Sequence, residues 1–446
     1  MQNVMKIKRR GLSTFQIIIL GFLGVILLGS FALMLPIATR DGEGASFLDA
    51  LFTSTTSVCV TGLVVQDTGT YWTGFGHAVI LMLIQIGGFG VVTVAMALLS
   101  VSGKKIGLRE RSVLQEAISA PHMSGLVRMI RFILKFVFLV EAIGAVALFT
   151  VFGPEFGFWK GLWFSIFHSI SAFCNAGIDL LGIKGEYSSL TGYNTNPVIN
   201  LTIMLLIITG GLGFFTWDDI KQKKFHIRQY RMQSKVILIT TAILIIVPSI
   251  YFFFLEFQDL PLSSRIWSSL FQSVTPRTAG FNSVDLTLFT ETGLVLIIIL
   301  MLIGGAPGST AGGMKVTTAA ALFSSAAAVF GKKNQTVFFG RRLNEDTIKN
   351  ASAILLLYMT LFLVGGMAIS YMEDVTIVEA LFETASAIGT VGLTLGITPS
   401  LGPVSHVILI LLMFLGRVGG LTLIYATVSD RYNNGSRYPQ ENLTVG

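Results

Sequence analysis

Four short segments of this 446-residue chain end in a glycine and are built mainly of small residues, a pattern that can bind a bare ion through backbone oxygens. The glycines are 115, 103 and 112 residues apart. A phenylalanine stands ten residues before the glycine in copies 1, 2 and 4, and nine residues before it in copy 3. This regularity indicates a repeated structural unit. The segments are Cys59-Val60-Thr61-Gly62, Cys174-Asn175-Ala176-Gly177, Arg277-Thr278-Ala279-Gly280 and Gly389-Thr390-Val391-Gly392.

Glycine suits such a segment because it lacks a side chain and can adopt a positive φ, which turns backbone oxygens towards a pore. Aligned carbonyls replace the hydration shell of an ion in channel selectivity filters. The alternative is an interfacial turn whose glycine packs against a helix. That alternative suits a single copy, whereas four copies in register favour a filter.

The composition requires elements that cross a membrane. The chain is 52% hydrophobic and 12% charged, whereas soluble domains carry about 25% charged residues. Several apolar runs are long enough to span a bilayer. The first run, from Phe15 to Pro36, is too long for a signal peptide and lacks a cleavage site. We therefore expect a multi-pass protein of the cell membrane, surrounded by lipid.

Positive charge is concentrated in the tails and in three linkers. These segments hold 24 of the 31 Lys and Arg residues. Such a positive-inside distribution predicts that both termini and the three linkers are cytoplasmic. Since it also accounts for the net charge of +7, nucleic-acid binding is not expected. The basic segments are Lys6 to Arg10, Lys104 to Lys135, Lys221 to Lys235, Lys332 to Lys349, and Arg431 with Arg437.

Each repeat consists of an apolar span, a short segment of roughly 12 to 18 residues that cannot cross the bilayer, and a second span. The sequence therefore predicts an all-α membrane protein with eight transmembrane helices and four re-entrant pore helices, in pseudo-four-fold arrangement around one pore. The predicted units are residues 1–128, 129–234, 235–349 and 350–430, with a cytoplasmic tail at 431–446. The predicted second spans are about Phe75–Val101, Pro197–Phe215, Gly293–Phe330 and Pro403–Ser429.

Two glycine-rich motifs inside second spans superficially suggest phosphate loops. Gly87-Gly88-Phe89-Gly90 and Gly210-Gly211-Leu212-Gly213 follow no strand, so we interpret them as sites of close helix packing. No linker is large enough for a nucleotide-binding domain, and we expect no nucleotide on this chain.

The second span of repeat 3 is interrupted. Twelve residues contain five glycines and one proline, at a cost to a helix of about 1 kcal/mol per glycine and about 3 for proline. Unwound backbone at this depth must face protein or water, so we interpret the segment as a gate below the filter, with a packing kink as the alternative. The candidate gate residues are Gly304, Gly305, Ala306, Pro307, Gly308, Ser309, Thr310, Ala311, Gly312, Gly313, Lys315 and Arg417.

Arg417 is placed by the sequence near the middle of the last span, where an arginine costs about 2.5–3.5 kcal/mol. It aligns with Gly88 and Gly211 of the first two repeats. We expect a pore-facing cation that forms, with Lys315, a barrier to potassium. The alternative is an ion pair with Glu141.

The remaining reactive residue types show no catalytic pattern. Cys59 and Cys174 share a register that makes a disulfide conceivable, but two buried thiols fit a two-cysteine chain better. The five histidines lack metal-ligand spacing, and His168 is interpreted as a structural hydrogen-bonding residue. With no nucleophile or metal constellation in the spans, an enzyme is not expected.

The four repeats, with one glycine in each pore loop, and the interrupted span resemble the Trk/Ktr/HKT superfamily of cation transporters, most closely the membrane subunit of bacterial Ktr potassium uptake systems. The resemblance implies that the filter is formed by Gly62, Gly177, Gly280 and Gly392. It implies potassium as the transported ion bound at the filter, and glycine rather than serine in the first repeat implies preference over sodium. No copy reads as a full TVGYG, which departs from tetrameric potassium channels.

The resemblance also implies partners. These are a second copy, in a homodimer with one pore per subunit, and a cytoplasmic nucleotide-binding ring that docks on the basic linkers and C-terminal tail. Sodium as an activator is left open. The alternative function, an ion-coupled secondary transporter of a small solute, would require paired or inverted repeats and midplane acids. Four parallel copies with few such acids favour potassium transport.

Overall fold

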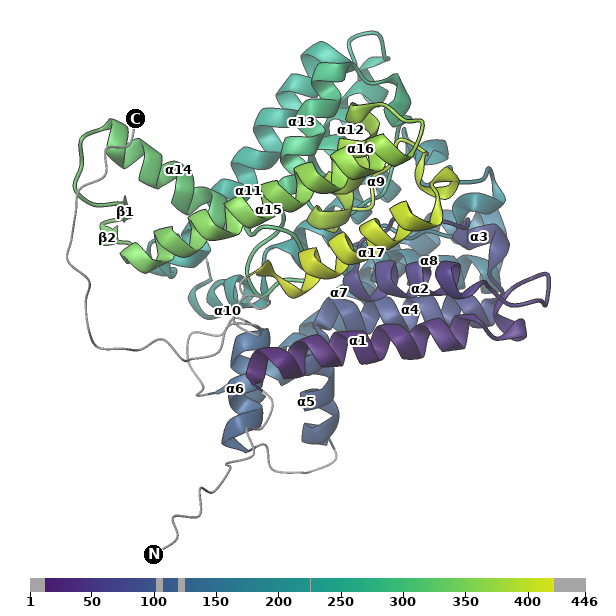
Figure 1. Cartoon of the computed structure of the whole chain (residues 1–446), viewed down its shortest axis with the longest axis horizontal. Helices are drawn as coiled ribbons and strands as arrows, with labels where there is room; N and C mark the ends of the chain where they lie inside the picture. The colour runs from purple at the N-terminus through teal and green to yellow at the C-terminus, as the bar shows by residue number, and fades with distance from the viewer. Residues whose placement is uncertain (1–12, 102–106, 119–124, 225, 421–446) are drawn as a thin grey trace, which may run out of the picture.

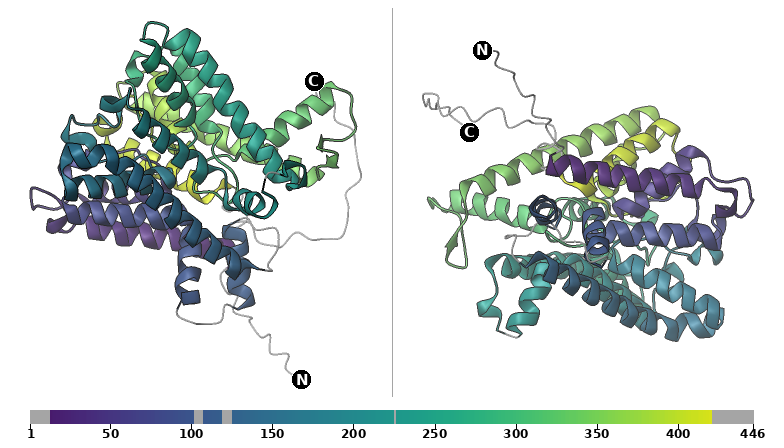
Figure 2. Two further views of the ribbon diagram at one scale, coloured as in Figure 1. Left: turned by 180° about the vertical axis from the view of Figure 1, so that it is seen from behind. Right: turned by 90° about the horizontal axis from the view of Figure 1, so that it is seen from below.

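The computed structural model describes residues 13–101, 107–118, 125–224 and 226–420. The basic N-terminal tail, the C-terminal tail and the end of the predicted fourth second span lie outside the described residues. Apolar helices running side by side make up most of the described chain (Figures 1 and 2).

Within the described residues, four helices are long and apolar enough to cross a membrane. They overlap the first spans that the sequence predicts, at about Phe15–Pro36, Met129–Gly153, Val236–Phe257 and Ala351–Met372. The helix α11 continues into a π-helical turn at Phe252–Glu256. Each exposes large apolar side chains, which in a membrane contact lipid; Leu28, Val146, Val247 and Leu356 are examples. The helices are α1 (Thr14–Leu33), α7 (Leu126–Phe156), α11 (Met232–Tyr251) and α15 (Glu345–Met372).

Each long helix is followed by a short helix that ends at one of the glycine segments. These helices have 13 to 16 residues, or about 20–24 Å at 1.5 Å per residue. Since about 30 Å of hydrocarbon must be crossed, they are too short to span. Ser46 and Thr376 cap two of them at the N-terminus. The pore helices are α2 (Phe47–Cys59), α8 (Phe158–Phe173), α12 (Leu262–Val274) and α16 (Ile377–Gly389).

The second spans are broken, and for repeat 1 the prediction of one continuous span over Phe75–Val101 was wrong. Gly90, Gly213 and Gly419 lie where these helices end or break, with φ values of +81°, +83° and +89°, a conformation that glycine adopts without steric cost. In repeat 2 the two helices meet at 95°. The helices are α4 (Gly74–Phe89) and α5 (Val91–Val101), α9 (Pro197–Gly211) and α10 (Phe214–Lys223), α13 (Glu291–Leu302) and α14 (Val316–Phe330), and α17 (Pro403–Val418).

The connections contain little regular structure. The loop that precedes α4 carries α3 (Thr68–Tyr71), and the first basic linker carries α6 (Leu108–Ala117). The third basic linker forms a hairpin of β1 (Val337–Phe338) and β2 (Arg341–Arg342), which the all-α prediction omitted. Strands of two residues leave no alternating pattern in a sequence.

The helices close into a ring. Each pore helix packs against the long helix before it. The second span of each repeat also packs against the pore helix of the next repeat, in the pairs α4–α8, α9–α12, α13–α16 and α17–α2. Because the last pair returns to the first repeat, the four pore helices surround a common axis.

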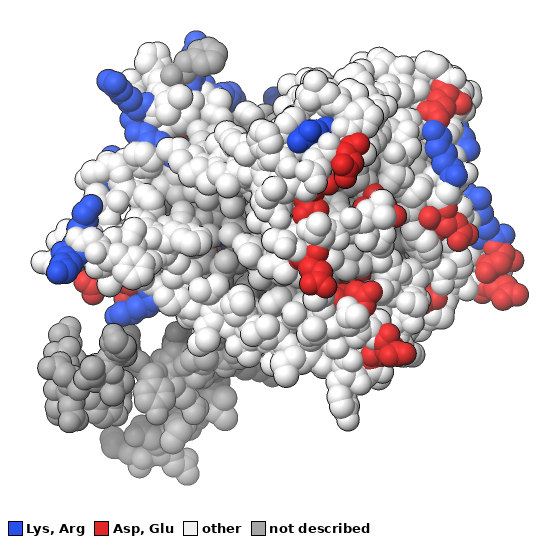
Figure 3. Space-filling model, turned by 90° about the horizontal axis from the view of Figure 1, so that it is seen from above, with Lys and Arg blue, Asp and Glu red and all other residues white. Residues whose placement is uncertain are grey.

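Charge is segregated along the molecule. In the face shown in Figure 3, basic side chains gather mainly towards one end and acidic side chains towards the other, with an uncharged zone between them. The hairpin and α10, which carry basic linker residues, lie at one end, and the loop with α3 lies at the other (Figure 1). An uncharged zone between polar ends is what a membrane requires.

Candidate functional site

The pore helices are anchored by the four phenylalanines that mark the repeat. Phe52, Phe167, Phe271 and Phe382 are completely buried. Four residues later in each helix stands a hydroxyl residue, one turn further on the same face. Copy 3 has one residue fewer between its phenylalanine and its glycine, and this missing residue therefore lies after the hydroxyl, in the turn that follows the helix.

The backbone after each pore helix follows one pattern in all four repeats. The residue two before the glycine is left-handed at Val60, Asn175, Thr278 and Thr390, with φ between +51° and +66°. The glycines themselves have φ of +102°, +66°, +81° and +91° in chain order. Non-glycine residues rarely adopt this region, and its cost of about 1–3 kcal/mol indicates a functional constraint.

The structure brings the four glycines together. A Cβ atom on Gly62 would overlap the carbonyl oxygen of Ala176, the residue before the glycine of repeat 2. The same relation links Gly177 to Ala279, Gly280 to Val391, and Gly392 back to Thr61. The ring thus passes through the repeats in chain order and closes, and every position in it excludes a side chain.

Side-chain hydroxyls hold this backbone in place, and the sequence analysis missed them. The Gly62 and Gly392 amides donate to Thr56 Oγ1 and Ser386 Oγ, each over 2.9 Å. The Ser171 hydroxyl donates to Ile178 O over 2.6 Å, and the Thr275 hydroxyl to Phe281 O over 2.7 Å. We call these four hydroxyls the filter clamps. The sequence could have identified these residues, because each stands four residues after one of the four repeated phenylalanines.

Three threonine hydroxyls in the glycine segments lack a protein partner. Thr61, Thr278 and Thr390 are fully buried, and their Oγ1 atoms make no hydrogen bond within the described part of the chain. Buried hydroxyls require a partner, which water or a cation can supply. A ring of carbonyls and hydroxyls without a carboxylate suits a weakly held monovalent cation.

The other predicted filter residues lie at the ends of the pore helices. Cys59 and Cys174 are buried and form no disulfide, which confirms the interpretation as thiols. Arg277 is buried; its carbonyl accepts a hydrogen bond from Asn175 Nδ2 over 3.2 Å, and its Nε and Nη1 have no partner among the described residues. Gly389 ends α16, where a Cβ atom would overlap the Met301 carbonyl.

The glycines at the start of the second-span motifs allow close helix packing, as predicted. Cβ atoms on Gly87, Gly210 and Gly416 would overlap the carbonyl oxygens of Val58, Phe173 and Ile388, respectively. Each of these carbonyls lies four residues before a filter glycine. The last glycine of each motif lies just after its helix or, for Gly213, just before the next one, so one motif serves both packing and helix breaking.

The interrupted segment of repeat 3 lies beneath the glycine ring. It leaves α13 at Ile303, which pairs with Met314 in a parallel bridge before α14 begins. On the repeat 2 side, Ala306 N–H donates to Gly211 O over 2.9 Å and Gly308 O accepts from Phe214 N–H over 2.8 Å. The Thr310 hydroxyl contacts Phe173 O at 3.0 Å and Asn175 Oδ1 at 3.1 Å.

The same segment reaches repeat 4. Gly313 N–H donates to Gly416 O over 3.2 Å. A Cβ atom on Gly312 would overlap the side chain of Thr390 in the fourth glycine segment. Repeats 2 and 4 are the two neighbours of repeat 3 in the ring, so residues Gly304 to Lys315 bridge both neighbours of their own repeat.

Two cations fix this segment through its carbonyls. The Lys315 ammonium donates to Ala311 O over 2.8 Å and to Gly312 O over 3.2 Å. The Arg417 guanidinium donates to Thr310 O and to Gly87 O of repeat 1. Arg417 therefore links three repeats. It lies in the last turn of α17 and not near the middle of a helix, because Gly419 breaks the span.

The alternative partner for Arg417 is engaged elsewhere. Glu141 accepts two hydrogen bonds from Gln85 Nε2, at 3.0 and 3.2 Å. No ion pair joins it to Arg417 within the described residues. His168 makes contacts with Phe164 O at 2.7 Å and with the Leu180 amide at 3.4 Å, which agrees with a structural role.

Comparisons with known proteins agree with this geometry. A family model described as TrkH, cation transport protein, matches residues 5–434. The chain is 40% identical to the potassium/sodium uptake protein NtpJ of Enterococcus hirae, with 98% of each chain covered. It is 38% identical to the Ktr system potassium uptake protein B of Bacillus subtilis, covering 97% of this chain and 96% of that protein.

A solved structure shows the same fold. The crystal structure of the potassium transporter TrkH from Vibrio parahaemolyticus matches with a TM-score of 0.73 at 19% identity. The match covers 96% of this chain and 87% of the other. At this identity the likeness is one of fold.

Proposed function

The chain belongs to the TrkH family of cation transport proteins, and from this premise we propose that it conducts potassium into the cell through the ring of four glycines. Its relatives are ion uptake proteins and not enzymes. The observation that carries the proposal is the closed relation between each filter glycine and the carbonyl of the next repeat. It supports a single pore within one chain, with eight crossings in pseudo-four-fold arrangement.

Selectivity for potassium over sodium follows from the backbone. A potassium ion sheds its hydration shell when carbonyl oxygens replace its water at matching distances. The filter clamps, with Thr56 as an example, hold those carbonyls. Glycine at all four positions keeps side chains out of the ion path.

The segment Gly304 to Lys315 acts as the gate. Its contacts with repeats 2 and 4 place it against the C-terminal ends of two pore helices, and in this proposal it obstructs the ion path there. Arg417 and Lys315 hold the segment and place positive charge beside it. Transport then requires the hydrogen bonds from these cations to the carbonyls of the segment to break. A shift of a few kcal/mol in the equilibrium between a closed and an open state is enough for this.

The bias comes from a separate cytoplasmic subunit. Three relatives carry names that describe them as components of a Ktr system. We carry this over to the present chain as a nucleotide-binding ring that docks on the basic linkers and C-terminal tail. Co-purification with such a subunit should be lost when the third basic linker is neutralised, and retention would contradict this docking site.

The assembly is a homodimer in which each chain has its own pore. Every chain supplies four pore helices, so a complete ring requires no second copy. Crosslinking in native membranes should give a species of twice the chain mass, and recovery of monomers alone would contradict the dimer.

Flux into proteoliposomes tests the function. Purified protein should take up rubidium, an analogue of potassium, and external potassium should compete while sodium competes weakly. Uptake of a small solute driven by an ion gradient, with no rubidium flux, would support the secondary transporter instead.

A further inference from the structure

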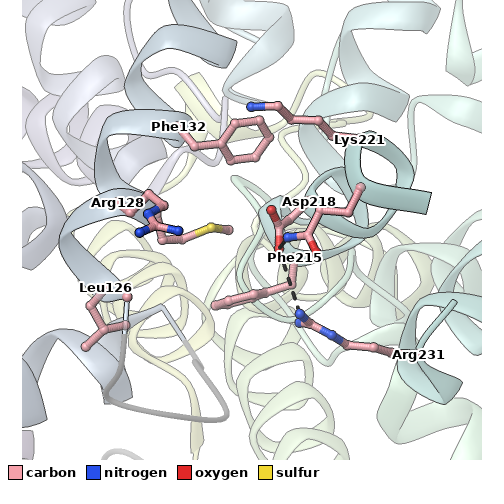
Figure 4. A pocket seen from close by; sticks show the side chains of 10 residues that line it. Leu126, Arg128, Phe132, Phe215, Asp218, Lys221 and Arg231 are labelled. Carbon is pink, nitrogen blue, oxygen red and sulfur yellow. Dashed lines mark hydrogen bonds and ion pairs between the residues drawn. The ribbon is translucent and has the colours of Figure 1, made fainter. Parts of the chain in front are cut away.

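A cavity of about 420 Å³ opens where the basic ends of three segments meet. It lies between the beginning of α7, the helix α10, and the residue that precedes α11 (Figure 4). The side chains that line it include three cations, one carboxylate and two phenylalanines. The glycine ring and the segment Gly304 to Lys315 contribute none of its lining residues.

Only one of the three cations is neutralised by protein. Arg231 Nε lies 3.3 Å from Asp219 Oδ1, and its Nη2 lies 3.8 Å from Asp218 Oδ2. Arg128 and Lys221 form no ion pair within the described residues. The Lys221 ammonium lies over the Phe132 ring, 4.7 Å from its centroid, which holds it at the cavity. The cavity thus presents two uncompensated positive charges to an anion.

The position of the cavity identifies the kind of anion. Arg128 lies in the first turn of α7, a helix long enough to cross a membrane, and the exposed apolar side chains of this helix begin further along, at Phe138. The guanidinium is therefore at the polar end of a predicted span, on the side where lipid headgroups lie. Phe132 and Phe215 supply apolar walls beside the cations, as Figure 4 shows. Basic pockets between helices at this level bind anionic lipid headgroups. We propose that Arg128 and Lys221 bind the phosphate group of an anionic phospholipid, whose acyl chains lie along α7.

The cavity is joined to the segment beneath the filter. Phe215, one wall of the cavity, packs against Gly308, and the neighbouring Phe214 amide donates to Gly308 O over 2.8 Å. Lipid bound to α10 therefore acts on the helix that holds this segment. The effect on flux rests on the gate proposed above, whereas lipid binding does not.

A binding titration on the full-length protein in neutral detergent tests the site. The probes are short-chain phosphatidylglycerol, short-chain phosphatidylcholine and inorganic phosphate. We expect phosphatidylglycerol to bind most tightly. Each of Arg128→Gln and Lys221→Gln should weaken its binding by about five-fold, since one basic residue contributes about that factor at an anionic surface.

Two controls separate the site from general charge and from misfolding. The double substitution Lys332→Gln with Lys333→Gln removes two exposed cations outside the cavity and should leave binding unchanged. Arg128→Lys keeps the charge and should retain most of the affinity. Equal binding of the two lipids, or unchanged phosphatidylglycerol affinity in the Arg128 and Lys221 variants, would overturn the proposal. Equal binding of inorganic phosphate would overturn the lipid assignment.

Discussion

At the scale of residues, the candidate filter depends on the lack of a side chain at four glycine positions and on the hydroxyl groups that hold the adjacent backbone. A side chain at any filter glycine would overlap a carbonyl of the neighbouring repeat and would also face an unfavourable φ. Behind the ring, hydroxyls clamp the backbone that carries the carbonyls. Selectivity is therefore attributed to backbone geometry and its supports.

The Thr56 clamp gives the first prediction. Thr56→Val removes the acceptor for the Gly62 amide and leaves a buried donor unsatisfied, at a cost of about 1–3 kcal/mol. We expect weaker discrimination between potassium and sodium in rubidium uptake. Thr56→Ser keeps the hydroxyl and should behave like the parent protein. Loss of discrimination in both variants would show that the hydroxyl is not the cause.

The sequence predicted the filter glycines because glycine and phenylalanine recur at fixed spacing. It did not predict the partners of Arg417, because both acceptors are backbone carbonyls distant in the chain. Choosing between Glu141 and those carbonyls as the partners of Arg417 required knowing how three repeats are placed in space.

At the scale of elements, the second spans show where sequence reasoning stopped. The long first spans and the short pore helices follow from the lengths of apolar runs, and the structure has them. The break at Gly90 does not follow, because a glycine within an apolar run has the same appearance whether it permits packing or ends a helix. In the structure, Gly87 packs and Gly90 breaks.

The interrupted segment gives the second prediction. Deletion of residues 306–312 removes the contacts with repeat 2 and the Thr310 carbonyl that Arg417 of repeat 4 holds, and potassium should then leak without a regulatory subunit. The milder Thr310→Val removes the two contacts of one hydroxyl and should raise basal flux in the same direction. Ser309→Ala, which loses only a bond within the segment, is the matched control.

These variants can also contradict the gate. A deletion protein that reaches the membrane and still conducts only with its partner would show that the segment is not the gate. Equal basal flux in Thr310→Val and Ser309→Ala would show that the contact with repeat 2 is not part of it.

At the scale of the whole molecule, the segregation of charge predicts orientation. The basic linkers should face the cytoplasm and the filter should open outward. Glu186 and Lys333 are exposed, and the native cysteines are buried. Cysteines introduced at these two positions should therefore label from opposite sides, with Glu186→Cys reactive from outside intact cells. Labelling of both positions from outside would contradict this orientation.

The order of the repeats around the axis could not be predicted from the sequence. Four equivalent repeats permit either direction of rotation and several neighbour relations. The packing of α4 on α8 and of α17 on α2 determines the order. The number and type of repeats follow from the sequence pattern, whereas the closing of the four repeats into a ring follows from tertiary contacts.

The central claim, that four glycines form one potassium filter, is tested most directly by cation competition for rubidium uptake in proteoliposomes. The variants are Gly62→Ser and Gly392→Ser, with Gly24→Ser as a control because α1 leaves open space around that glycine. The account predicts that both filter variants lose about tenfold or more of the preference for potassium over sodium, since strain of this kind costs about 1–3 kcal/mol. The control should keep that preference. Unchanged discrimination in both folded filter variants would contradict the account.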